Sequence, residues 1–254
     1  MEPPRATVVV PLYIWPCKTA DWQPLFDVIA AHPAVEFLVI VNPSSGPGAA
    51  SLPDGQDYQR EVPKLTAAPN VTTVGYVRID YCRKPLHDVC EEIDRFAGWF
   101  TQHGTDVPGM SVDGIYLDET PNHFSPGRKL YLEALYTHIK GKEGLLGQRL
   151  VLHNPGTPPD AGLASPTFVD VVVTCEEPYE RYMGDEVQRR LADYHFHRLR
   201  SAYQLSGVPK ERIAEVTRQL RHRGAYVFAT SLVDDFYESF GACWNDFIAA
   251  MEVK

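Results

Sequence analysis

The sequence predicts an α/β fold, a single (β/α)8 barrel of the TIM type that extends over residues 1–254. The length of 254 residues fits one such barrel. Short apolar runs alternate with stretches in which apolar residues recur at helical spacing. The apolar runs contain few alternating polar residues, as expected for parallel strands that are covered on both faces.

The predicted strands follow one another through the whole chain. They lie at Thr7–Tyr13, Phe37–Val41, Val71–Val77, Gly114–Asp118, Leu150–His153, Val169–Thr174, His197–Gln204 and Tyr226–Ala229. An open doubly wound sheet is the main alternative, and it usually carries a Gly-rich phosphate turn after its first strand. Here the first strand ends in Pro11-Leu-Tyr-Ile-Trp-Pro16. The sequence therefore favours the barrel.

Apolar residues at helical spacing follow most of these strands. The helical stretches lie at Trp22–Ile29, Asp57–Ala67, Leu86–Phe100, Leu132–Ile139, Ile213–Leu220 and Phe240–Met251. Pro63 is expected to weaken or kink the second of them. The aromatic residues Phe240, Trp244 and Phe247 are interpreted as core packing of the closing helix.

Composition excludes several classes of function. The formal net charge is −9 and no block of Lys and Arg occurs, which argues against nucleic-acid binding. No apolar stretch is long enough to span a membrane, and no leader opens the chain, so we expect either an intracellular protein or a sequence given without its leader. Five scattered cysteines without a CxxC pair predict no metal site, although a Cys82–Cys90 disulfide is an option. We expect a monomer that uses no cofactor.

The active site of such a barrel lies at the carboxyl ends of the strands. The strand ends carry Tyr13, Trp15, Asn42, Ser45, Tyr76, Asp80, Tyr81, Arg83, Asp118, Glu119, His153, Asn154, Glu176, Glu177, Tyr179, Ser231, Asp234 and Asp235. In glycosidic cleavage one carboxylic acid protonates the leaving oxygen, while a second carboxylate attacks the sugar or activates water. Aromatic rings pack against sugar rings, and amides and charged groups bind the hydroxyls. The set therefore indicates a carbohydrate site.

Asp118 and Glu119 form the most informative local pair. Both can reach the barrel mouth because the chain turns at the end of the strand, and crowding would raise one of the two pKa values. In the alternative interpretation Glu119 caps the next helix or pairs with an arginine. Glu176 or Glu177 after the sixth strand would supply the second carboxylate, with the other one solvated or capping a helix.

Two further groups at the strand ends are interpreted as structural. Asp234 or Asp235 could also supply the second carboxylate, but the Ser231-x-x-Asp pattern favours a helix N-cap. His153, His195 and His197 are interpreted as hydrogen-bonded structural residues rather than catalysts.

The strand-end motifs resemble the spherulin-4-like proteins, which include a fungal glycoside hydrolase that acts on galactosaminogalactan. The matching segments are Pro11-Leu-Tyr-Ile-Trp-Pro16, Asn42-Pro-Ser-Ser-Gly-Pro-Gly48, Gly75-Tyr-Val-Arg-Ile-Asp-Tyr81 with Arg83, Gly114-Ile-Tyr-Leu-Asp-Glu119, Asn154-Pro-Gly156, and Glu176 with Tyr179. They occur in order from the first strand to the sixth and cover about two thirds of the chain.

The resemblance implies a (β/α)8 barrel that hydrolyses α-1,4-linked galactosamine or N-acetylgalactosamine, outside the cell or at the cell wall. It implies catalytic roles for Asp118, Glu119 and Glu176, with Glu177 as the fallback for Glu176. The residues implied to bind substrate are Tyr13, Trp15, Asn42, Tyr76, Asp80, Tyr81, Arg83, Asn154 and Tyr179. Ile79 and Cys82 depart from the expected smaller or polar residues, which puts the shape of the nearby subsite in question.

These observations lead to the hypothesis of an endo-acting hydrolase. Glu176 would be the general acid and Asp118 the nucleophile or orienting carboxylate, unless an acetamido group of the substrate attacks its own anomeric carbon. A carboxyl separation of about 5–5.5 Å would predict retention of configuration, and about 6.5–9.5 Å inversion. The first rival is a non-catalytic sugar-binding barrel. The second is a lyase or isomerase, for which no strand end offers a lysine.

Overall fold

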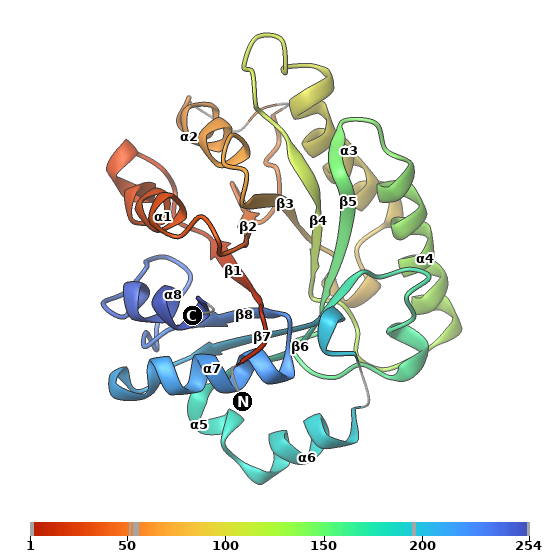
Figure 1. Cartoon of the computed structure of the whole chain (residues 1–254). Helices are drawn as coiled ribbons and strands as arrows, with labels where there is room; N and C mark the ends of the chain where they lie inside the picture. Colours follow the sequence, from red (N-terminus) through yellow and green to blue (C-terminus); the bar gives the residue numbers. More distant parts are fainter. Residues whose placement is uncertain (1–2, 51, 53–55, 195–196, 253–254) are drawn as a thin grey trace.

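The computed structural model describes residues 3–50, 52, 56–194 and 197–252, and it confirms the predicted barrel. Its parallel strands pair in chain order, and β8 pairs with β1 to close the sheet, Thr7 opposite Tyr226 and Val8 opposite Val227 (Figure 1). The strands are β1 Thr7–Leu12, β2 Phe37–Val41, β3 Val71–Arg78, β4 Val112–Asp118, β5 Leu145–Asn154, β6 Val171–Pro178, β7 Ser201–Ser206 and β8 Tyr226–Ala229.

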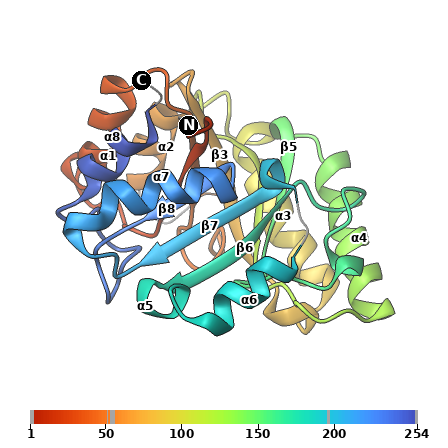
Figure 2. The same ribbon diagram turned by 60° about the horizontal axis from the view of Figure 1, so that its bottom comes forward.

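The helices lie outside the barrel and bury one apolar stripe each against it (Figure 1). They are α1 Thr19–Ala31, α2 Asp57–Thr66, α3 Leu86–Thr101, α4 Pro126–Gly141, α5 Tyr179–Tyr182, α6 Asp185–Asp193, α7 Ile213–Arg223 and α8 Trp244–Met251. Short α5 and α6 lie beside β6 (Figure 2). β2 is buried at every position, which explains why it shows no polar alternation.

Several predicted boundaries are confirmed and several are wrong. β2 and β8 have the predicted bounds. β5 begins at Leu145 rather than Leu150, because the ladder with β4 shifts register between Val112 and Gly114. β7 begins at Ser201 rather than His197, since Arg198–Arg200 form a 3-10 turn whose arginines donate to backbone carbonyls. Pro63 lies within α2 and does not end it.

The largest correction concerns the sixth strand. It runs over Val171–Pro178, so Glu176 and Glu177 lie within β6 and do not follow it. A register shift between Val173 and Cys175 in the ladder with β7 accompanies this extension. Because adjacent residues of a strand point to opposite faces, the two glutamates face different environments.

The predicted N-cap at Ser231 is also wrong. Residues 230–243 form a loop, and α8 begins only at Trp244. Phe240 therefore precedes the helix, although its ring packs against Trp244 at 5.1 Å between centroids. Backbone bonds hold the loop to neighbouring strands: Gly207 donates to Leu232, and Tyr13 donates to Tyr237.

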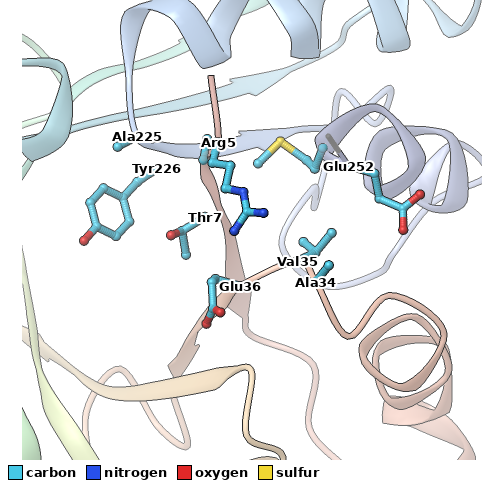
Figure 3. Close-up of a pocket in the computed structure, with 10 residues that line it drawn as sticks. Arg5, Thr7, Ala34, Val35, Glu36, Ala225, Tyr226 and Glu252 are labelled. Carbon is cyan, nitrogen blue, oxygen red and sulfur yellow. The ribbon is translucent and has the colours of Figure 1, made fainter. Parts of the chain in front are cut away.

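A hollow of about 200 Å³ lies at the amino ends of β1, β2 and β8, opposite the predicted active site. Figure 3 shows Arg5, Thr7 and Glu36 among the residues that line it. Active sites of such barrels lie at the opposite end, at the carboxyl ends of the strands, so we assign this hollow no role.

All cysteines are free, so the Cys82–Cys90 disulfide is not formed. Within the described residues, no helix is long and apolar enough to cross a membrane.

Candidate active site

Asp118 and Glu176 meet at the carboxyl ends of β4 and β6, where a single side chain joins them. The amide nitrogen of Asn154, at the end of β5, donates to Asp118 Oδ1 at 2.8 Å and to Glu176 Oε2 at 2.6 Å. The two carboxyl oxygens that accept from Asn154 are therefore at most about 5.4 Å apart, a separation that favours a retaining pair over an inverting one.

The orientation of Asn154 is fixed by the turn that follows it. The backbone N–H of Gly156 donates to Asn154 Oδ1 at 2.9 Å, which is the hydrogen bond of an Asx turn. Gly156 has φ +66°, a conformation that glycine adopts without strain. With its oxygen held by the turn, the amide directs both N–H groups at the carboxylates. The segment Asn154-Pro-Gly156 thus positions the pair, and Asn154 has no amide hydrogen left for a substrate.

Each carboxylate also accepts from one tyrosine. Tyr76 lies on β3, and its hydroxyl donates to Asp118 Oδ2 at 2.5 Å. Tyr237, from the loop before α8, donates to Glu176 Oε1 at 2.6 Å. Tyr13 lies between these two tyrosines, with ring centroids 5.5 Å from Tyr76 and 5.2 Å from Tyr237. The aromatic groups thus exclude water from one side of the pair.

Burial raises the pKa of Glu176. Donation from Tyr237 and Asn154 lowers it, the charges of Asp118 and Glu177 raise it, and burial is the largest effect. A raised pKa keeps the carboxyl protonated to higher pH, which is the property of a general acid.

Glu177 faces the other side of β6. It is buried and pairs with Arg190 at 2.8 Å and with Arg181 at 3.4 Å. The predicted alternative that one glutamate of this pair is solvated is wrong, because the outer face of the strand is covered by α5 and α6. The geometry favours Glu176 over Glu177 as the partner of Asp118.

Glu119 lies beside Asp118 but turns toward Arg78. Its carboxylate is 2.8 Å from Arg78 Nε, and its backbone has φ 53°. This ion pair agrees with the alternative interpretation of the sequence, in which Glu119 pairs with an arginine. The structure brings Glu119 to the rim of the site, and its catalytic role stays a prediction.

Left-handed backbone marks the loop after β3. The backbone of Asp80, Tyr81 and Cys82 has φ 48°, 53° and 66°, values that residues other than glycine rarely adopt. Two hydrogen bonds hold the loop against β4, from Ile79 N to Asp118 O at 3.0 Å and from Tyr81 N to Glu119 O at 2.7 Å. The strained conformation of this loop is therefore held in place by the backbone carbonyls of Asp118 and Glu119.

The other predicted binding residues are distributed around the mouth. Asp80 pairs with Arg83 at 2.5 Å, and the Arg83 guanidinium lies 5.6 Å from the centre of the half-exposed Tyr81 ring. These three residues form a rim beside Glu119.

Three predicted residues contact other parts of the molecule. Trp15 donates to Asp57 at the start of α2, and the side chain of Asn42 accepts from Gly46 within its own loop. Tyr179 accepts from Arg212. Within the described part of the chain, no hydrogen bond joins these three to Asp118 or Glu176.

The histidines stand apart from this chemistry. His153 is buried beside Phe168, and burial lowers its pKa to about 3, so the ring is neutral at physiological pH. Its Nε2 finds no partner among the described residues, so the prediction of a hydrogen-bonded histidine is wrong for this atom. His197 is exposed, and its carbonyl accepts from Ser201; His195 lies outside the described residues. No group of His, Cys, Asp and Glu in the described ranges is arranged to hold a metal ion.

Sequence reasoning missed Tyr237 and Gln204. Tyr237 lies in a loop that was predicted to begin a helix, so its approach to Glu176 was hidden. Gln204 is opposite Glu176 in the ladder of β6 and β7, and its amide donates to Tyr116 at 3.2 Å. Once the register of these strands is known, the pairing of Gln204 with Glu176 follows.

Together these features define the class: a closed parallel (β/α)8 barrel with a carboxylate pair at the carboxyl ends of its strands. The chain belongs to spherulation-specific family 4, Spherulin4, whose model matches residues 7–251, so the resemblance predicted from the motifs is confirmed. It is 39% identical over 155 residues to Spherulin-4 of Physarum polycephalum, a match that covers 61% of this chain and 40% of the relative's length.

Solved structures agree with this assignment. The crystal structure of Aspergillus clavatus Sph3 in complex with GalNAc has a TM-score of 0.92 and 34% identity, over 98% of each chain. The mannanase man26 of Bacillus subtilis has a TM-score of 0.53 and 9% identity, over 96% of this chain and 85% of that one. The mannanase shows the shared barrel fold alone.

Proposed function

We propose that the chain is an endo-acting glycoside hydrolase that cleaves α-1,4-linked galactosamine or N-acetylgalactosamine in an amino-sugar polysaccharide. The observation that carries the proposal is the Asn154 amide, which holds Asp118 and Glu176 at the spacing of a retaining pair. The similarity to Sph3, which was crystallised with GalNAc, supports an amino sugar as the ligand.

In this mechanism Glu176 gives its proton to the glycosidic oxygen as the bond to the anomeric carbon breaks. Asp118, held by Tyr76, attacks that carbon from the opposite face, or it orients the acetamido group that does so. Glu176, now a carboxylate, takes a proton from water as the water oxygen attacks the anomeric carbon and the bond from that carbon to Asp118, or to the acetamido oxygen, breaks. The configuration is retained by either route.

Glu119 completes the proposed set in a different role. Its ion pair with Arg78 and its place at the rim favour the binding of a substrate hydroxyl or amine over proton transfer. The rim residues Tyr81, Asp80 and Arg83 are proposed to contact the sugars on this side.

Mass spectrometry of polysaccharide digests tests the function. Wild-type protein is incubated with galactosaminogalactan, with chitin and with chitosan. We expect oligosaccharides of several lengths from galactosaminogalactan alone. Release from chitin or chitosan instead would overturn the substrate, and release from none of the three would overturn the hydrolase in favour of a sugar-binding barrel.

A further inference from the structure

A pocket of about 230 Å³ opens on one side of the carboxylate pair. It is bordered by Glu176 and Pro178 of β6 and by Gln204 and Ser206 of β7. These residues are opposite one another in the ladder, Glu176 with Gln204 and Pro178 with Ser206. Of the proposed pair, only Glu176 is among the described residues that line it. The pocket therefore lies beyond Glu176, away from Asp118.

Two buried polar side chains lie at the base of the pocket. Gln204 is 2% exposed and Ser206 is 5% exposed, and both belong to the face of β7 that points inward, since they are two residues apart. The amide nitrogen of Gln204 donates to the Tyr116 hydroxyl, and its amide oxygen lies 3.4 Å from the Tyr237 hydroxyl, whose hydrogen is given to Glu176. The Ser206 hydroxyl, by contrast, has no hydrogen-bond partner within the described residues. A buried polar group that opens onto a pocket is a place for a ligand hydroxyl.

One wall of the pocket is aromatic. Phe236 and Tyr237, from the loop before α8, pack edge to face with ring centroids 4.4 Å apart, and both line the pocket. An aromatic wall beside two buried polar side chains complements a sugar residue, which has an apolar ring face and a polar periphery.

Charge restricts the kind of sugar. Glu177 also borders the pocket, but its carboxylate lies on the other face of β6, where Arg190 and Arg181 balance its charge. Glu176 carries its proton, and therefore no charge, when it acts as the general acid of the proposed mechanism. The pocket therefore favours an uncharged residue over one with a free, protonated amine.

We propose that this pocket is a subsite for one uncharged sugar residue, N-acetylated or neutral, on the leaving-group side of the bond that is cleaved. The inference rests on the proposed function, because Glu176 as general acid defines the leaving-group side. Ser206 and Gln204 bind the hydroxyls or the acetamido oxygen, and Phe236 packs against the ring.

Binding of α-1,4-linked N-acetylgalactosamine oligosaccharides of two to five residues tests the subsite. Isothermal titration uses Glu176→Gln protein, to prevent cleavage, with and without a second change at Ser206. Ser206→Phe fills the pocket, and we expect at least about tenfold weaker binding of the longer oligosaccharides. Ser206→Ala removes only the hydroxyl and should weaken binding about fivefold. Thr137→Val on α4 is the surface control.

The outcomes separate the two proposals. Equal affinities with and without the Ser206 changes would overturn the subsite and leave the hydrolase standing. Tighter binding of the fully deacetylated oligosaccharides to this pocket, lost in Ser206→Phe, would overturn the preference for an uncharged residue. Binding of no oligosaccharide to any variant would overturn the proposed function and the subsite with it.

Discussion

At the scale of single residues, each carboxyl group of the proposed pair accepts two hydrogen bonds, one from Asn154 and one from a tyrosine. Asn154 donates to both groups, Tyr76 donates to Asp118, and Tyr237 donates to Glu176. Burial raises the pKa of Glu176. The assignment of Glu176 as the acid therefore comes from its burial rather than from the number of donors.

Removal of the Tyr237 hydroxyl should raise the pKa of Glu176 further. Donation from this hydroxyl stabilises the charged carboxylate, so Tyr237→Phe favours the protonated form while the ring contacts remain. An acid that must be protonated then stays active to higher pH, and we expect the alkaline limb of kcat/KM to move up by about one pH unit. The measurement is a pH profile of both proteins. A limb that stays in place, or one that moves to lower pH, would contradict this role.

At the scale of elements, the turn after β5 connects backbone conformation to catalysis. Gly156 must keep φ +66° so that its N–H reaches Asn154 and the amide faces the carboxylates. An added Cβ would meet Glu176 Cβ at 3.9 Å, which is ordinary contact, so a side chain here is opposed by backbone strain and not by lack of space.

Gly156→Ala should therefore lower both stability and activity. A left-handed alanine costs about 1–2 kcal/mol of folding free energy, and a displaced Asn154 should reduce kcat by at least about tenfold. Urea unfolding and initial rates measure the two effects. Gly127→Ala in α4 is the control: its Cβ meets nothing within 4 Å, and its stability should be equal or slightly higher. Equal behaviour of the two variants would show that the turn does not position the pair.

At the scale of the whole molecule, one buried arginine joins both ends of the described chain to the barrel. Arg221 of α7 is 1% exposed. Its guanidinium donates to Pro3 and Pro4 before β1, at 3.1 and 3.0 Å, and to Ala250 and Glu252 at the end of α8, at 2.8 and 3.0 Å. These bonds fasten the segments that flank the closure between β8 and β1.

Arg221→Met should destabilise the barrel by about 3 kcal/mol, because buried carbonyls lose charged donors. The corresponding fall in Tm is about 6–12 °C. Calorimetry should show this for Arg221→Met, whereas Arg218→Met, an exposed position on the same helix, should stay within about 0.5 kcal/mol of wild type. An Arg221 variant as stable as the Arg218 variant would contradict the account of closure.

The sequence predicted the barrel because its strands are short apolar runs. Such runs can be recognised from their own residues, without knowledge of the strands with which they pair. β2 and β8 were predicted with the bounds observed. Extension of β6 to Pro178 was not predicted, since Cys175, Glu176 and Glu177 continue the strand through pairing with β7. The end of β6 is set by its pairing with β7, and the local sequence pattern contains no information about that pairing.

The candidate site was predicted in part for the same reason. Asp118, Asn154 and Tyr76 end predicted strands, and the barrel brings strand ends together. Tyr237 reaches the site from a long loop, whose path is set by contacts with β1 and β7. Trp15 and Tyr179 follow strands as predicted, but the chain carries them to α2 and to Arg212.

Proton NMR of oligosaccharide release by wild type, Glu176→Gln, Asp118→Asn and Glu133→Gln tests the carboxylate pair most directly. Wild type and Glu133→Gln, a surface change on α4, should release product with the α-anomer formed first, as retention requires. Glu176→Gln and Asp118→Asn should be folded and slower by at least about a thousandfold. Release of the β-anomer first, or folded variants that retain wild-type rates, would contradict the assignment of Asp118 and Glu176 as a retaining pair.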